Sequence, residues 1–223
     1  MKKIVLICVV ILMTGFVSLH GQSFNFKIGA DYPIMGSDLW DTNIENLAFE
    51  KQDMVSGYYG VEFELFMGKH LSLALEAGHY SQEIFTAYRD VVYDDDSAIP
   101  QDISLRISSF EADFKFYPMG HRNKFNPYFG GGAGLYAWKY IQGGDFVDFE
   151  DYTVSEGEAI TTTISPGFNV KAGFVYRFRK SIGISVEARY RYLKGELSSQ
   201  FEGFGKLDLS GATINIGLNL FLR

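Results

Sequence analysis

After its first two dozen residues, the sequence alternates between apolar and polar positions with a period of two. In residues 24–32 every even position is apolar and every odd position is polar or glycine. A period of two predicts a β-strand with one apolar and one polar face. The same alternation returns in residues 59–65, 71–78, 103–116, 128–140, 168–178, 184–192 and 212–222. The chain is therefore expected to form about eight antiparallel strands.

The fourth of these segments changes phase along its length. Its apolar residues are Ile103, Leu105 and Ile107 in the first part, and even-numbered positions of 110–116 in the second. One extra residue in a strand turns every later side chain to the opposite face. We therefore predict a β-bulge near Ser108 and Ser109.

The connections between the segments alternate in length. The long polar ones are 34–55, 83–102, 142–160 and 195–208, and the short ones are 67–70, 118–126 and 179–182. The long connections hold twenty acidic residues, whereas the short ones hold five basic residues and no acidic one. Long loops on one side and short turns on the other are typical of a transmembrane barrel in an outer membrane. An even number of strands places both termini on the periplasmic side and the long loops outside the cell.

The first residues have the layout of a secretory signal peptide. Lys2 and Lys3 precede an apolar run, 4–17, which is short for a transmembrane helix, and cleavage is expected after Gly21. This divides the chain into a signal peptide, 1–21, and a barrel domain, 22–223. A retained helical anchor is the alternative interpretation. Cys8 is the only cysteine, so the mature chain would hold neither a disulfide nor a cysteine-ligated metal.

Charge excludes one class of partner. The formal net charge is −7, and removal of Lys2 and Lys3 brings it to −9. Such an acidic chain is not expected to bind nucleic acid. After residue 21, no stretch approaches the roughly 18 consecutive apolar residues that a membrane helix requires.

Two opposite barrels fit the alternation. A soluble barrel of the lipocalin kind would turn its apolar face inward, and a membrane barrel would turn it outward to lipid. The polar face is rich in small residues: Gly29, Gly60, Ala74, Gly78, Gly173, Gly183 and Gly217. Because the interior of an eight-stranded barrel is narrow, these residues favour the membrane barrel. We then expect lipid-facing interfacial girdles from Tyr117, Tyr128, Tyr136, Trp138, Tyr140, Tyr190 and Tyr192.

The segment Asn126-Pro-Tyr-Phe-Gly-Gly-Gly-Ala-Gly-Leu-Tyr136 resembles the glycine-alternating strand of small outer-membrane barrels, the families of outer membrane proteins A, X and W. Residues 170–192 are similar to the adjacent hairpin. The closing strand, 213–222, resembles the signal read by the barrel-assembly machinery, although Phe221 has the lumen phase and Arg223 follows it. The resemblance implies an integral outer-membrane protein without a cofactor, in contact with outer-membrane lipids and lipopolysaccharide.

Turning the polar phase inward predicts a charge network in the lumen. Its members are Lys27, Asp31, Glu62, Glu64, Glu76, Glu111, Asp113, Lys115, Lys171, Arg177, Glu187, Arg189 and Arg191. Seven acidic and six basic residues are nearly balanced, and buried charges are tolerated when they are paired. Either a solid plug or a narrow, gated passage fits this composition. A wide pore needs many more strands.

Three further hypotheses concern ligands and chemistry. Carboxylates at 94–96, or those of Asp148, Glu150 and Asp151, are oxygen donors suited to Ca²⁺ or Mg²⁺, although neither set has the spacing of a defined calcium loop. Residues 79–82, His-Tyr-Ser-Gln, resemble the His-x-Ser-Asn motif of the outer-membrane lipid A deacylase, with Gln in place of Asn. A carrier of small apolar molecules, as in the outer membrane protein W family, needs aliphatic residues where this lumen phase has Glu and Arg.

The default interpretation is a non-enzymatic envelope protein with no assigned catalytic or metal-binding residue. Its long acidic loops would contact lipopolysaccharide, other surfaces or a partner protein, because binding functions usually lie on loops held by a rigid scaffold.

Overall fold

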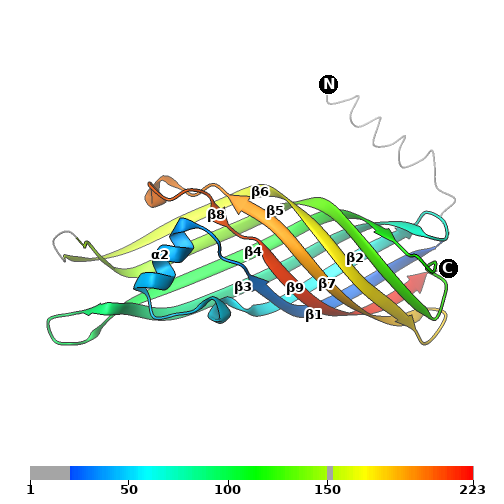
Figure 1. The fold of residues 1–223 in the computed structure, drawn as a ribbon, viewed down its shortest axis with the longest axis horizontal. Helices are drawn as coiled ribbons and strands as arrows, with labels where there is room; N and C mark the ends of the chain where they lie inside the picture. The colour runs from blue at the N-terminus through cyan, green and yellow to red at the C-terminus, as the bar shows by residue number, and fades with distance from the viewer. Residues whose placement is uncertain (1–20, 150–152, 223) are drawn as a thin grey trace, which may run out of the picture.

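The computed structural model describes residues 21–149 and 153–222, so the predicted signal peptide lies outside the described residues except for Gly21. Eight antiparallel strands close into a barrel (Figure 1). They are β1 (Gln22–Pro33), β2 (Ser56–Phe66), β3 (Leu71–Val92), β4 (Ala98–Phe116), β5 (Phe125–Val147), β6 (Val154–Arg177), β7 (Ile182–Gly195) and β9 (Gly211–Leu222). Each strand pairs with its neighbours in sequence, and β1 closes the ring against β9. The predicted eight-stranded up-and-down barrel is confirmed.

Short elements lie in the connections at the end of the barrel away from the chain termini (Figure 1). Helix α2 (Asp38–Asn46) and the 3-10 helix η1 (Lys51–Met54) follow β1. The 3-10 helix η2 (Ser199–Phe201) and the two-residue strand β8 (Leu207–Asp208), which pairs with the end of β7, precede β9. In the described part of the chain, each helix is too short or too polar to cross a membrane.

The strands have two lengths. Strands β3 to β6 contain 19 to 24 residues, whereas β1, β2, β7 and β9 contain 11 to 14. The part of β3 beyond His79 is about 40 Å long at about 3.3 Å per residue, so the long strands project far beyond the short ones. Most of 83–102 and 142–160, predicted as loops, is therefore strand. This prediction was wrong because cross-strand pairing continues through polar residues there.

The predicted bulge at Ser108 and Ser109 is also wrong. Strand β4 pairs with β5 in one unbroken register from Gln101 to Phe116. Its pairing with β3 is equally regular on both sides of Ser108 and Ser109. Consequently Leu105, Ile107 and Glu111 all lie on the inner face of one regular strand. Along β4 the inner face changes from apolar to polar. Odd-numbered side chains point inward throughout.

Five of the seven predicted girdle residues lie inside the barrel. Tyr117, Tyr128, Tyr136, Trp138 and Tyr140 are buried, and Tyr190 and Tyr192 face outward. Glycines make room for the buried rings: a Cβ at Gly173 would lie 2.9 Å from the Tyr128 ring, and one at Gly195 would lie 2.1 Å from the Trp138 ring. The girdle prediction was wrong because it did not ask whether each aromatic residue lies on the inward-facing or the outward-facing side of its strand.

The outer surface carries a band of exposed apolar side chains. It includes Phe26, Ile28, Val61, Phe110, Phe114, Leu135, Ile164, Phe168, Ile214 and Ile216. The apolar face therefore points outward, as a membrane barrel requires and a soluble barrel of the lipocalin kind does not. The band ends on β3 at Ala77, where His79 follows, and on β4 at Phe110, where Ser108 and Arg106 follow.

Candidate functional site

The centre of the lumen is the ammonium group of Lys27, on β1. Its Nζ atom donates to carboxylate oxygens of Glu62 at 2.9 Å, Glu76 at 2.8 Å and Glu187 at 2.9 Å. These side chains come from β1, β2, β3 and β7, and all four are fully buried. One cation thus joins strands on opposite sides of the ring.

Other bases extend this cluster along the barrel. Lys171 donates to Glu76 at 2.8 Å and to Asp113 at 2.7 Å. Arg189 bridges Glu76 at 3.2 Å and Glu111 at 3.1 Å. Lys115 donates to Glu62 at 2.5 Å and approaches Glu64 at 3.8 Å. The contacts form one continuous network of alternating charge.

Neutral donors complete the coordination of the carboxylates. The hydroxyl groups of Tyr58, Tyr117 and Tyr128 donate to Glu76, Glu64 and Glu187 at 2.6, 2.6 and 2.7 Å. The Asn169 amide donates to Glu111 at 2.6 Å and to Asp113 at 2.7 Å. Buried charges are stable when such bonds replace their lost hydration. Sequence reasoning missed these donors, although Tyr58, Tyr117 and Asn169 share the phase of the charged residues next to them in sequence, and Tyr128 shares the phase of the glycines on β5.

A second ion pair lies nearer the helical end. Arg191 donates two parallel hydrogen bonds of 3.1 Å to the carboxylate of Asp31. Its Nε atom donates to the Leu209 carbonyl oxygen at 3.1 Å. Thr213 donates to Asp31 at 2.6 Å and accepts from Arg189 at 3.3 Å. Thr213 therefore links this pair to the main network.

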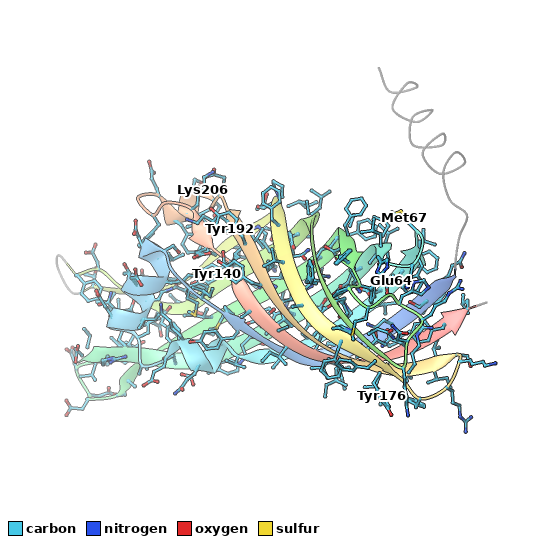
Figure 2. All side chains as sticks on the ribbon, turned by 45° about the vertical axis from the view of Figure 1, so that its right-hand side comes forward. Glu64, Met67, Tyr140, Tyr176, Tyr192 and Lys206 are labelled. Carbon is cyan, nitrogen blue, oxygen red and sulfur yellow. The ribbon has the colours of Figure 1, made fainter. Side chains whose placement is uncertain are left out.

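The structure brings together all the predicted lumen residues except Arg177. The other twelve are at most 3% exposed. Arg177 lies at the end of β6, where its guanidinium stacks 3.5 Å from the centroid of the Phe221 ring. Figure 2 labels Glu64 toward the end with the chain termini, and Tyr140 toward the opposite end.

Little space is left between these side chains. A Cβ at Gly217 would lie 2.1 Å from Oδ1 of Asn25, and one at Gly78 would lie 2.3 Å from the Tyr58 hydroxyl oxygen. Both distances are shorter than any normal contact, so the small residues are matched to the bulky ones across the narrow interior.

The helical end of the barrel is filled by apolar side chains. We call this region the cap: residues 34–55 and 196–210 with the projecting ends of β3 to β6. Its core contains Met35, Leu39, Trp40, Leu47, Phe49, Met54, Tyr80, Ile103, Leu105, Ile107, Tyr136, Trp138, Tyr140, Leu193, Phe201, Leu207 and Leu209. Helix α2 is tied to this core because Trp40 donates to the Asp208 carbonyl oxygen at 2.9 Å and Asn43 donates to the Tyr140 hydroxyl at 2.9 Å.

The structure does not bring together the residues proposed for a deacylase-like site or for a divalent-cation site, among the residues that it describes. His79 Nδ1 lies 2.9 Å from the Ser108 hydroxyl, on the neighbouring strand, so its observed partner is not Ser81. Among residues 21–149 and 153–222, no group of three or more side chains is placed to hold a metal ion. Glu150 and Asp151 lie outside the described residues. Two hydrogen bonds from Ser97 hold the pKa of Asp95 below its usual value and occupy that carboxylate within its own turn.

No protein-family model and no curated protein sequence matches this chain. Among solved structures, it is similar to the outer membrane protein OprG from Pseudomonas aeruginosa. The identity is 14%, the match covers 92% of this chain and 97% of OprG, and the TM-score is 0.56. The chain has the fold of a small outer-membrane β-barrel.

Two other solved barrels are more distant. A major outer membrane protein from Thermus thermophilus is 13% identical over 91% of this chain and all of its own, with a TM-score of 0.48. The N-terminal barrel domain of OprF from Pseudomonas aeruginosa is 14% identical over 90% of this chain and all of its own, with a TM-score of 0.44.

Proposed function

We propose that this outer-membrane barrel is a non-enzymatic protein with a sealed lumen, which holds its cap outside the cell as a binding surface. The main support for a sealed lumen is the ionic network around Lys27. It joins opposite walls of the barrel, and every member is buried. A solute crossing at this level would have to separate several buried ion pairs at once, which is costly in a site without water.

The orientation follows from the two ends of the barrel. Both described ends of the chain and the short turns belong on the periplasmic side, and the cap belongs outside the cell, as is usual for outer-membrane barrels. The exposed acidic residues of the cap include Asp38, Asp41, Glu45, Glu50, Asp53, Asp94, Asp95, Asp96, Glu156, Glu158, Glu196 and Glu202. This charge favours a partner with a basic surface, or lipopolysaccharide contacted through bridging cations. Outer-membrane lipids surround the apolar band, and the barrel-assembly machinery is the expected partner during insertion.

Conductance across a planar lipid bilayer tests the sealed lumen. The purified protein is expected to give no discrete conductance steps, whereas a porin inserted under the same conditions gives them. A double variant, Lys27→Ala with Lys171→Ala, removes both central cations, and Lys194→Ala with Lys206→Ala is the control with equal loss of charge. Discrete steps from the wild-type protein would overturn the proposal, whatever the variants do.

A second candidate is the capture of a small solute by the cap. A cavity of about 230 Å³ lies between α2, η2 and the long hairpins, with Phe146, Phe201 and Tyr88 among its lining residues. Apolar walls with a few amide groups are typical of small-molecule sites. Because Trp40 and Trp138, the only tryptophans, both lie in the cap core, their fluorescence should respond to cyclohexanol. An equal response from Ala159→Phe, which fills the cavity, would exclude this candidate.

A further inference from the structure

The end of the barrel opposite the cap contains two adjacent hollows. One has a volume of about 310 Å³ and the other about 430 Å³, and both are lined by Arg122, Arg177 and Lys180. We call the space around these three residues the basic cleft. Arg122 comes from the turn between β4 and β5, Arg177 ends β6, and Lys180 lies in the turn to β7. The cleft therefore lies where two neighbouring turns meet.

The charged side chains that line the basic cleft are cationic. No aspartate or glutamate among the described residues lines either hollow. Lys124 and Arg179 add further positive charge to the larger one. The carboxylate of Glu64, whose charge acts on Arg177, does not line either hollow and already accepts hydrogen bonds from Tyr117 and Ser72.

Arg177 shows how the cleft could bind an anion. Its guanidinium lies against the face of Phe221, which fixes the plane of the group and leaves its N–H edge free to face an acceptor. The Nε atom is buried and has no hydrogen-bond partner in the described part of the chain. A buried donor without an acceptor is destabilising, so an incoming oxygen atom would relieve that cost.

The backbone holds the cleft in place before any ligand arrives. The Arg177 amide donates to the Lys124 carbonyl oxygen at 2.7 Å, which ties the two turns together. Within the second turn, the Arg179 amide donates to the Ile182 carbonyl oxygen at 3.1 Å. The Lys124 ammonium lies 5.4 Å from the ring centroid of Tyr176, which Figure 2 labels at this end. A preorganised site loses less entropy on binding.

The position of the cleft matches the level of lipid headgroups. Phe178, which lines the larger hollow, and Phe125, at the start of β5, are both about half exposed at the rim of the apolar band. Arginine pairs well with phosphate, because its forked donors match two phosphate oxygens. Basic pockets at a membrane face bind phosphate-bearing lipid headgroups in other membrane proteins.

We propose that the basic cleft binds a phosphate group, supplied either by a phospholipid headgroup of the surrounding leaflet or by soluble phosphate. The donors are Arg177 and Lys180, and the other basic residues of the lining add positive charge. The site lies outside the ionic network around Lys27, so it is independent of whether the lumen conducts and of what the cap binds.

Calorimetric titration of the refolded protein in a neutral detergent tests the site with two probes, inorganic phosphate and dihexanoyl phosphatidylglycerol. The test variant combines Arg177→Met, which keeps an apolar stem against Phe221, with Lys180→Gln. The control combines Lys194→Gln with Lys206→Gln near the cap, and it loses the same charge. The test variant is expected to bind at least tenfold more weakly than the wild type, and the control within twofold of it.

The two probes distinguish the sources of phosphate. Binding of the lipid at least tenfold tighter than inorganic phosphate would assign the site to a headgroup, and equal binding of both would assign it to soluble phosphate. Failure of both probes to bind the wild type, or equal binding by the wild type and the folded test variant, would overturn the proposal. Retention of the heat-dependent shift in electrophoretic mobility shows that the test variant is folded.

Discussion

The lipid-facing part of the barrel and the cap are built on the same strands with opposite polarity. On β4, Glu111 and Lys115 point inward and Phe114 points outward in the first region, whereas Leu105 points inward and Arg106 outward in the second. No register shift with β5 separates them. The strand is regular and its surroundings change from lipid to water. Which face becomes apolar is therefore decided by the solvent outside the barrel.

The two regions are also stabilised by different forces. The cap has an ordinary apolar core, whose stability comes from the burial of side chains such as Trp40 and Leu105. The membrane region gains nothing from placing apolar groups inside, because lipid already surrounds its outer face. Its interior depends instead on complete pairing of buried charges, so the loss of one partner should cost more there than the loss of one apolar side chain in the cap.

The largest effect is expected from the variant Lys27→Met. It leaves Glu62, Glu76 and Glu187 without their shared cation, and breaking a buried ion pair costs about 3–5 kcal/mol. Urea-induced unfolding in lipid vesicles, followed by the electrophoretic shift, measures the loss. Lys194→Met, at an exposed position, serves as the control. Equal stability of the two variants would show that the network does not hold the barrel together.

A cap variant should separate the two regions. Leu105→Ala removes a fully buried side chain from the cap core, and such changes cost about 3 kcal/mol. Tryptophan fluorescence, which reports on the cap, should change at a lower urea concentration, while the electrophoretic shift of the barrel stays at its wild-type midpoint. Leu135→Ala, on the lipid-facing surface, is the matched control. If both signals moved together, the cap and the barrel would form one cooperative unit.

Arginine substitutions on the outer face should locate the boundary. Phe114→Arg places a charge within the apolar band and is expected to cost about 2 kcal/mol or more, while Ser108→Arg, at its edge, should cost about 1 kcal/mol or less. Unfolding of both variants in vesicles gives the comparison. A larger cost at Ser108 than at Phe114 would place the boundary elsewhere.

The smallest effect concerns the tips of the long hairpins. The Tyr93 hydroxyl donates to Asp145 at 2.5 Å, and this bond raises the pKa of Tyr93 to about 12. Because the folded pKa is raised, the link persists at neutral pH and is lost as the pH rises toward 12. In Asp145→Asn the pKa of this tyrosine should return toward 10, as measured by ultraviolet difference absorbance. An unchanged titration would show that the two tips are not linked.

The barrel itself could be predicted from the sequence, because alternation, loop parity and small residues in the polar phase are all local signals. The buried aromatic residues were within reach as well: Tyr128 and Tyr136 share the even phase of the glycines at 130, 132 and 134, which marks the inner face. Following that phase would have placed them in the lumen.

The cap was not predictable in the same way. Residues 83–102 carry too much charge to resemble a strand, and their pairing depends on partners distant in sequence. The apolar residues Ile103 to Ile107 fit either a bulge or a change of solvent, and the sequence has no marker of where the membrane ends. Similarly, Arg177 has the phase of the network, but its guanidinium stacks on Phe221, a contact that depends on the three-dimensional arrangement of β6 and β9.

Spin labels along β4 test the central claim most directly. The mature chain is expected to lack cysteine, so single cysteines at outward positions 106, 108, 110, 112 and 114, and at inward position 105, can be labelled one at a time in vesicles. Accessibility to oxygen reports lipid, and accessibility to a water-soluble nickel complex reports water. We predict that the outward labels change from lipid to water between 110 and 106, while the label at 105 is shielded from both. Exposure of the label at 105 to lipid would contradict the account. It would mean that the side chains of the strand switch faces there, and that the strand has not passed from lipid into water.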